Sequence, residues 1–133
     1  MDNTSTVRDI YEAFGRGDVE TIASKLADDV AWESWEDNHA QRAGVPQLEP
    51  RRGRDAALEF FALAGAMEIR EFAVRDVLGS ERQVAADVLF DAQLPGGGRL
   101  RDEELHLWTF DDEGRVTRMR HYVDTAKHIA ATR

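Results

Sequence analysis

The chain has 133 residues and a mass of 15.0 kDa, with 42% hydrophobic and 32% charged residues, which is typical of one folded domain and excludes a largely disordered chain. Its 17 Lys and Arg residues against 26 Asp and Glu residues give a net charge of −9, which disfavours nucleic acid and anionic membrane surfaces as partners. The sequence has no cysteine, which excludes disulfides, thiolate nucleophiles and zinc–cysteine sites.

The organisation of the chain predicts one domain over residues 1–133. No internal repeat or low-complexity tract divides it. The start lacks a cationic segment followed by an apolar run, and no stretch reaches the ~20 apolar residues of a membrane span. We therefore expect a cytoplasmic protein without membrane association.

Helical periodicity dominates the first part of the chain. A first helix is predicted by an apolar stripe at i, i+3, i+4 and i+7, formed by Val7, Ile10, Tyr11 and Phe14. Thr4 or Ser5 is expected to cap this helix, and the glycines within 15–17 end it. Asp18 is expected to cap a second helix over 18–26. Both helices are short, so they must pack against another element.

A strand, a long loop and a third helix are predicted next. Residues 30–35 form a short aromatic and β-branched run that is typical of a strand. Residues 36–53 are polar, contain glycines and prolines and show no period, which is typical of a functional or mobile loop. Asp55 is expected to cap a third helix that ends near Gly65.

The second half of the chain has the period of two that strands show. Four successive strands are predicted, at 69–78, 83–94, 100–110 and 116–123. A phase slip between Ile69 and Phe72 predicts a β-bulge. Asp124 is expected to cap a short helix that ends near Ile129. This order predicts an α+β fold in which a strongly curved antiparallel sheet wraps around three helices from the N-terminal half.

The strand over 100–110 carries the first candidate for chemistry, His106. Strand alternation puts its imidazole on the face of Trp108 and Phe110, with Leu105 and Leu107 on the opposite face. An apolar surround lowers the pKa of an imidazole, which suits a general acid, a general base or a hydrogen-bond donor. A core histidine bonded to a carboxylate or to a backbone carbonyl is the alternative. The leucines of the other face predict self-association of the sheet.

Three further polar residues are candidates: Glu33, Tyr11 and His121. Glu33 lies between Trp32 and Trp35, whose rings would raise the pKa of the carboxyl by desolvation. Regular alternation instead places Glu33 in solvent when Trp32 faces the core, unless the strand end lets both turn inward. Tyr11 lies on a buried helix stripe, so its hydroxyl needs a structural partner or a ligand. His121 ends the last predicted strand, where alternation admits either it or its neighbour to a cavity.

Motifs for metals and cofactors are absent from the sequence. The four histidines have none of the close spacings of a local zinc motif. No glycine-rich phosphate loop follows a predicted strand, and no serine lies in a nucleophile elbow. We therefore expect neither a metal nor a cofactor.

Several segments, in this order of elements, resemble the nuclear transport factor 2-like superfamily, and within it SnoaL-like polyketide cyclases and ketosteroid isomerases. The segments are YEAF at 11–14, GDV at 17–19, LADDVAW at 26–32, RGR at 52–54 and GRVTRM at 114–119. The resemblance extends from Val7 to Ile129. It implies a cone-shaped α+β barrel with a pocket at its wide end, and homodimers through the outer face of the sheet.

When the sequence is laid against a ketosteroid isomerase without gaps, its residues differ at the positions of the catalytic groups. His106 falls where that family has the buried acid of its oxyanion hole, and Ser34 falls where it has the carboxylate that moves the proton. Ile10, with Tyr11 next to it, falls at the position of the oxyanion tyrosine. The resemblance therefore implies the pocket without the steroid chemistry.

These observations predict a protein that binds a small apolar or amphipathic molecule and acts by cofactor-free acid–base chemistry, as an isomerase, cyclase, hydratase, dehydratase or epoxide hydrolase. Its catalytic residues would be His106, Glu33 and Tyr11. The residues expected to contact the ligand are Phe14, Trp32, Ser34, Trp35, Phe61, Trp108, Phe110 and His121. The alternative is a non-catalytic module that binds a metabolite or only dimerises. An open cavity of at least ~300 Å³ beside His106 would favour the ligand site over a cone filled by its own side chains.

Overall fold

The computed structural model describes residues 2–33 and 35–133. The first half of the chain forms α1 (Asn3–Arg16), α2 (Val19–Ser24), β1 (Leu26–Trp32), α3 (His39–Arg42), the 3₁₀ helix η1 (Pro46–Leu48), β2 (Arg51–Arg52) and α4 (Arg54–Gly65). The second half forms β3 (Glu68–Gly79), β4 (Gln83–Gln93), β5 (Arg99–Phe110), β6 (Val116–Tyr122) and α5 (Thr125–Thr132). Ser34, which the sequence placed against a ligand, lies outside the described residues.

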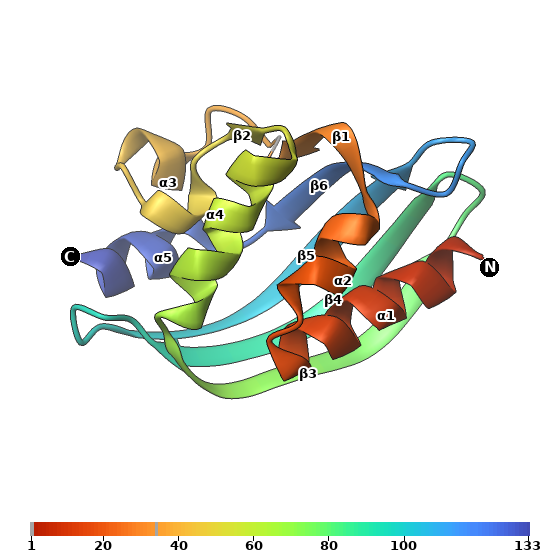
Figure 1. Cartoon of the computed structure of the whole chain (residues 1–133). Helices are drawn as coiled ribbons and strands as arrows, with labels where there is room; N and C mark the ends of the chain where they lie inside the picture. Colours follow the sequence, from red (N-terminus) through yellow and green to blue (C-terminus); the bar gives the residue numbers. More distant parts are fainter. Residues whose placement is uncertain (1, 34) are drawn as a thin grey trace.

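The six strands form one curved sheet in the order β2-β1-β6-β5-β4-β3 (Figure 1). The fold is α+β, as predicted, and the β3–β4–β5–β6 pairs are antiparallel. The sheet is nevertheless mixed and unclosed, because β1 runs parallel to β6 and the sheet ends at β2 and β3. The sheet is thus mostly antiparallel, as predicted, and the one parallel pair was not predicted because β1 reaches β6 through a long connection instead of a hairpin.

Helices α1, α2 and α4 lie over one face of the curved sheet (Figure 1). The apolar stripe of α1 is directed at the sheet, since Val7 and Ile10 are buried there with Val84 and Trp108. The inward positions of β4 and β5 alternate with outward ones, so one face of these strands is buried and the other is partly exposed. A concave layer of helix and strand side chains results, and it holds the candidate site.

The helix ends show how local sequence determines the boundaries. Asp18 caps α2 by accepting a hydrogen bond from the backbone N–H of Thr21, as predicted. Asp2 caps α1, so the expectation of Thr4 or Ser5 was wrong by two or three residues. Gly53, with φ of 91°, occupies the N-cap of α4 in place of the expected Asp55.

The segment 36–53 is more ordered than its polar composition suggested. It contains α3, η1 and β2, and Asn38 caps α3 through the backbone N–H of Gln41. A separate apolar cluster explains this order, because Ala40, Val45 and Leu48 are buried against Val123 and Ile129. The expectation of a loop without regular structure was therefore wrong. These residues pack on the end of β6 and on α5, beside the candidate site.

The C-terminal helix α5 completes this end of the molecule. Asp124 caps it through the backbone N–H of Lys127, as predicted. The turn between β4 and β5 approaches α5 so closely that a Cβ atom at Gly98 would overlap the carbonyl oxygen of Ala131. This close approach sets the position of α5 against β5. Within the described residues, no helix is long and apolar enough to cross a membrane.

Candidate functional site

A cavity of about 70 Å³ lies between the helices and the sheet. Aromatic and aliphatic side chains from α1, β1, α4, β3 and β5 form most of its wall. The polar residues that reach it are Tyr11, Gln47, Glu104, His106, His121 and His128. The volume is smaller than the ~300 Å³ typical of ligand pockets.

A groove of about 720 Å³ lies on the other side of part of this wall. The side chains common to the groove and the cavity are Tyr11, Phe14, Phe61, Ala64, Met67 and Phe72. The rings of Phe14 and Phe72 are 5.2 Å apart, and those of Phe14 and Phe61 are 6.0 Å apart. These shared side chains therefore lie between the cavity and the groove.

Tyr11 and His106 belong to one chain of hydrogen bonds. The Trp108 Nε1–H donates to the Tyr11 hydroxyl oxygen at 3.1 Å. The Tyr11 hydroxyl is 2.7 Å from Nδ1 of His106, and Nε2 of His106 is 3.0 Å from Oε1 of Glu104. Because Trp108 can only donate and the carboxylate accepts, Tyr11 donates to Nδ1 and His106 donates its Nε2–H to Glu104. Both ring nitrogens of His106 are thus engaged inside the protein.

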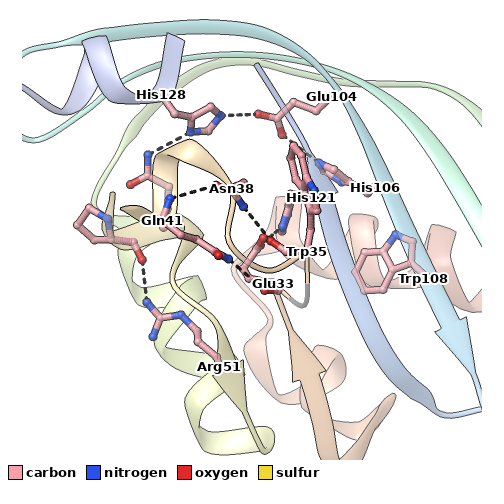
Figure 2. A network of polar contacts seen from close by, with 12 residues as sticks. Glu33, Trp35, Asn38, Gln41, Arg51, Glu104, His106, Trp108, His121 and His128 are labelled. Carbon is pink, nitrogen blue, oxygen red and sulfur yellow. Dashed lines mark hydrogen bonds and ion pairs between the residues drawn. The ribbon is translucent and has the colours of Figure 1, made fainter. Parts of the chain in front are cut away.

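Glu104 is also bound to His128, a residue of α5 (Figure 2). Nε2 of His128 is 3.1 Å from Oε2 of Glu104 and 3.5 Å from Oδ2 of Asp102. Nδ1 of His128 is 3.3 Å from Nε2 of Gln47. Asp102 also accepts a hydrogen bond from the backbone N–H of Asp124. A histidine from the C-terminal helix thereby joins two carboxylates of β5.

The charges of this cluster stabilise one another. Burial acts to lower the pKa of His128, but hydrogen bonds to Asp102 and Glu104 outweigh it and raise the pKa to about 9. Burial acts to raise the pKa of Glu104, yet hydrogen bonds from His106 and His128 hold it well below its ordinary value. His128 is therefore an imidazolium and Glu104 a carboxylate at neutral pH.

Glu33 is buried, with 2% of its surface exposed, and its carboxyl oxygen Oε1 is hydrogen-bonded to Nδ1 of His121. The backbone of Glu33 is left-handed, with φ of 59°, which ends the alternation of β1 so that Trp32 and Glu33 both face inward. The segment after β1 supports this turn, since Gln41 donates to the carbonyl oxygen of Glu33 at 3.5 Å and Asn38 to that of Trp35 at 2.8 Å (Figure 2).

The Glu33–His121 pair is a neutral acid–imidazole pair. Burial raises the pKa of Glu33 well above its ordinary value. Burial also lowers the pKa of His121 to about 4. Glu33 therefore carries its proton and donates it to Nδ1 of His121, which leaves Nε2 of that ring protonated. Among residues 2–33 and 35–133 this Nε2–H has no hydrogen-bond partner, and the His121 ring lines the cavity.

A second donor without a partner lies beside His121. Trp32 is 1% exposed and lines the cavity, and its Nε1–H finds no acceptor among the described residues. The rings of Trp32 and His121 have centroids 6.1 Å apart. A buried donor without an acceptor costs about 1–3 kcal/mol. Two N–H donors are thus available to a ligand oxygen.

The structure places most of the predicted site residues around one cavity. Its wall includes the predicted residues Tyr11, Phe14, Trp32, Phe61, His106, Trp108 and His121. Glu33 reaches the cavity only through His121. Trp35 and Phe110 do not line it: Trp35 packs on Tyr122, and Phe110 is buried in the core. Trp35 lies outside the wall because it follows the left-handed turn, and Phe110 does so because it lies at the far end of β5.

Asp102, Glu104, Gln47 and His128 complete the polar part of the site and were not predicted as site residues. A signal for two of them exists in the sequence. Asp102, Glu104 and His106 occupy alternate positions of one strand and so share a face. The contribution of His128 depends on how α5 packs, which strand alternation does not reveal.

Comparison with protein families decides the classification. Residues 7–119 match the family model of the SnoaL-like domain. The chain belongs to the SnoaL-like domain family. It therefore lies in the nuclear transport factor 2-like superfamily, as the sequence motifs predicted. A comparison with curated proteins finds no match.

Solved structures with similar folds support this classification of the SnoaL-like chain. An NTF2-like protein of unknown function from Burkholderia pseudomallei is 25% identical, with full coverage of both chains and a TM-score of 0.79. TerC, co-crystallised with polyporic acid, is 24% identical over 98% of both chains, with a TM-score of 0.76. The Δ5-3-ketosteroid isomerase of Mycobacterium sp. is 19% identical, covers 92% of this chain and 93% of its own, and has a TM-score of 0.71. The last two likenesses concern the fold alone.

Proposed function

We propose that this SnoaL-like chain binds a small, largely apolar molecule with a carbonyl or hydroxyl oxygen and transfers a proton to that oxygen without a cofactor. One observation carries the proposal: the buried Nε1–H of Trp32 has no partner among the described residues, and it borders a mostly apolar cavity beside His121, whose ring is hydrogen-bonded there through Nδ1 alone. Apolar walls with a few placed polar groups are typical of small-molecule sites. Donors aimed at a developing oxyanion lower the barrier to enolisation and related steps.

The proton would pass along the Glu33–His121 pair. His121 gives its Nε2 proton to the ligand oxygen while Nδ1 receives the proton of Glu33. A water molecule accepts the proton lost from the ligand carbon, so the ligand becomes an enol and the negative charge stays on the Glu33 carboxylate. Trp32 donates a hydrogen bond to the same oxygen. Tyr11 is a further polar contact, and His106 acts as a positioning residue for its hydroxyl.

The size of the cavity limits the ligand. About 70 Å³ holds only a few non-hydrogen atoms, so a ring-sized ligand requires movement of the wall shared with the outer groove. Phe14, Phe61 and Phe72 are each only partly buried, and rotation of these rings would join the two spaces. The small volume is also the observation that favours the alternative, a non-catalytic module whose interior is filled by its own side chains.

A matched pair of probes tests the oxygen contact. Cyclohexanone and methylenecyclohexane have nearly the same shape, but only the ketone accepts a hydrogen bond. With ¹⁵N-labelled protein, we expect the ketone to bind about 3- to 10-fold more tightly, the worth of one neutral hydrogen bond, and to shift the Trp32 indole N–H resonance. Trp32→Phe should remove this preference, whereas Trp35→Phe, outside the cavity, should keep it. Equal affinity for both probes would exclude the proposed oxygen contact.

Exchange of the α-hydrogens of cyclohexanone in D₂O tests the proton transfer. We expect the protein to accelerate this exchange and His121→Phe to reduce the acceleration by about 10²-fold or more, the usual contribution of one general acid. His39→Gln, at an exposed residue of α3, is the control. Ketone binding without accelerated exchange would support the non-catalytic alternative and contradict the proposed catalysis.

We further propose that the outer face of the sheet binds a second copy of the chain. Leu105 is 43% exposed there, on the face opposite His106. The ion pairs of Arg75 with Asp87 and Glu103 lie on the same face, and a twofold axis would let Arg75 of one copy pair with these carboxylates of the other. Analytical ultracentrifugation should show a dimer for the wild type and a monomer for Leu105→Glu, and a wild-type monomer at high concentration would contradict the proposal.

A further inference from the structure

Three buried side chains with metal-ligating atoms converge where α5 crosses β5. Asp102, Glu104 and His128 are 2%, 8% and 4% exposed, and one ligating atom of each lies within 4.8 Å of the others. Alternate positions of β5 place both carboxylates on the inner face. The bond from the backbone N–H of Asp124 to Asp102, 3.1 Å long, fixes the start of α5 beside them. The three groups are thus held by two packed elements of the fold.

The two distances from His128 to the carboxylates of this cluster are close to those between the ligand atoms of a metal site. Nε2 of His128 lies 3.1 Å from Oε2 of Glu104 and 3.5 Å from Oδ2 of Asp102. Metal bonds of about 2.1 Å separate two ligand atoms of a tetrahedral site by about 3.4 Å. A cation can therefore replace the proton on His128 with small shifts of the side chains.

The chemistry of the donors points to a transition-metal dication. Two carboxylates and one imidazole are ligands that Zn²⁺ and its neighbours accept. A dication would neutralise both carboxylates, with His128 as a neutral ligand. The outer partners that support metal ligands are also present, since Glu104 accepts from His106 through its other oxygen and Gln47 contacts Nδ1 of His128.

The cluster borders the cavity. Glu104 and His128 both line it, so a cation held by these residues would lie at the wall of the cavity. A water molecule or the oxygen of a small ligand can occupy them. Catalytic and ligand-exchanging metal sites have this arrangement of three protein ligands and an open position.

We propose that Asp102, Glu104 and His128 form a binding site for a divalent transition-metal cation, with Zn²⁺ as the best match and with its open coordination positions toward the cavity. The sequence-based expectation of no metal considered only closely spaced histidines, whereas these ligands come from β5 and from a helix more than 20 residues later. The site does not depend on the proton transfer proposed for His121 and Glu33.

Binding of Zn²⁺ to the full chain, freed of metals by a chelator, tests this site by isothermal titration calorimetry. We expect one equivalent to bind with micromolar or tighter affinity. Asp102→Asn and His128→Gln should each weaken binding by about tenfold or more, the scale of losing one ligand or its support. His39→Gln removes an exposed histidine and should leave the affinity unchanged. Circular dichroism checks that each variant is folded, and the isosteric Asp102→Asn keeps a test available if His128→Gln unfolds.

Substitution with Co²⁺ reports the coordination directly. We expect the visible absorption of a four-coordinate or five-coordinate Co²⁺ complex in the wild type and its loss in Asp102→Asn. Absence of Zn²⁺ binding at millimolar concentration would overturn the proposal. So would affinity that persists in Asp102→Asn and His128→Gln but falls in His39→Gln, because the cation would then occupy a surface site.

Discussion

Two buried clusters of histidine and carboxyl groups lie side by side in this protein and have opposite protonation. In one, a single carboxyl of Glu33 meets His121, and burial keeps both groups neutral. In the other, two carboxylates meet His128, and their hydrogen bonds overcome burial so that Glu104 is ionised and His128 is charged. The same residue types therefore give a proton-donating pair in one place and an ion pair in the other.

The comparison teaches that the number of hydrogen bonds to a buried charge decides its state. Glu104 accepts from two histidines, whereas the side chain of Glu33 has one histidine partner. Low dielectric penalises any charge, and only several charge-assisted bonds compensate for the loss of water. We therefore expect the Glu33–His121 pair to transfer protons, and the cluster around Glu104 to stabilise the fold.

The largest expected effect on stability comes from removing the negative charge of Glu104, which binds both His106 and His128. Glu104→Gln leaves the His128 imidazolium without one partner and replaces the acceptor of His106. Breaking a buried ion pair costs about 3–5 kcal/mol of unfolding free energy, measured by urea denaturation. Glu103→Gln, the exposed neighbour on the other face, should change stability by about 0.5 kcal/mol or less. Similar values for both variants would mean that the cluster does not stabilise the fold.

A substitution at the β4–β5 turn separates the two clusters. Gly98→Ala would place Cβ against the carbonyl oxygen of Ala131 and displace α5. We expect a loss of about 1–3 kcal/mol and changed NMR signals for His128, with those of His121 preserved. Gly96→Ala in the same turn meets no atom within 4 Å and serves as the control. Equal perturbation of both histidines would show that the clusters are not independent.

Acidification should act on the neutral pair. The folded-state pKa of His121, about 4, lies below its ordinary value of 6.5, so the unfolded chain binds a proton that the folded chain does not. The stability that the folded state gains from keeping His121 neutral is fully present above the ordinary pKa, and it is lost as the pH falls toward the folded-state pKa. Between about pH 7.5 and about pH 5, the wild type should lose roughly 2 kcal/mol relative to His121→Gln. A constant difference between the two proteins would contradict the depressed pKa.

The smallest expected effect concerns the hydroxyl that links Trp108 to His106. Tyr11→Phe leaves both partners unsatisfied and should cost about 1–2 kcal/mol in thermal or chemical unfolding. Tyr122→Phe removes a hydroxyl that contacts Arg120 on the outer face, and it should cost less than about 0.5 kcal/mol. If the two tyrosine variants are equally stable, the hydrogen bonds of Tyr11 contribute little.

Much of the fold was predictable because its strands and helices follow simple periods. The alternation along β4 and β5 and the caps at Asp18 and Asp124 were all readable from local sequence. The order within 36–53 was not, because Ala40, Val45 and Leu48 follow no period. The parallel β1–β6 pair also depends on long-range packing that no local pattern encodes.

The site was predictable in part, for physical reasons that differ between residues. His106 and Tyr11 lie on apolar stripes, which identified them as inward-facing. The burial of Glu33 required the left-handed backbone, which the sequence offered only as an alternative. Tyr11 and Glu104 occupy both ring nitrogens of His106, and for this reason the proton transfer is proposed for His121 instead. The positions of these two partners follow from tertiary packing, which no local sequence pattern reveals.

The left-handed turn at Glu33 has a consequence for how this protein can vary. At φ of 59°, residues other than glycine, asparagine and aspartate are disfavoured, and β-branched side chains most of all. Of the three tolerated replacements, only aspartate retains an acid, and its shorter side chain would draw the carboxyl away from the neighbouring ring. Evolution or engineering of new specificities is therefore expected to conserve position 33 and to exchange the partly buried aromatic residues of the wall instead.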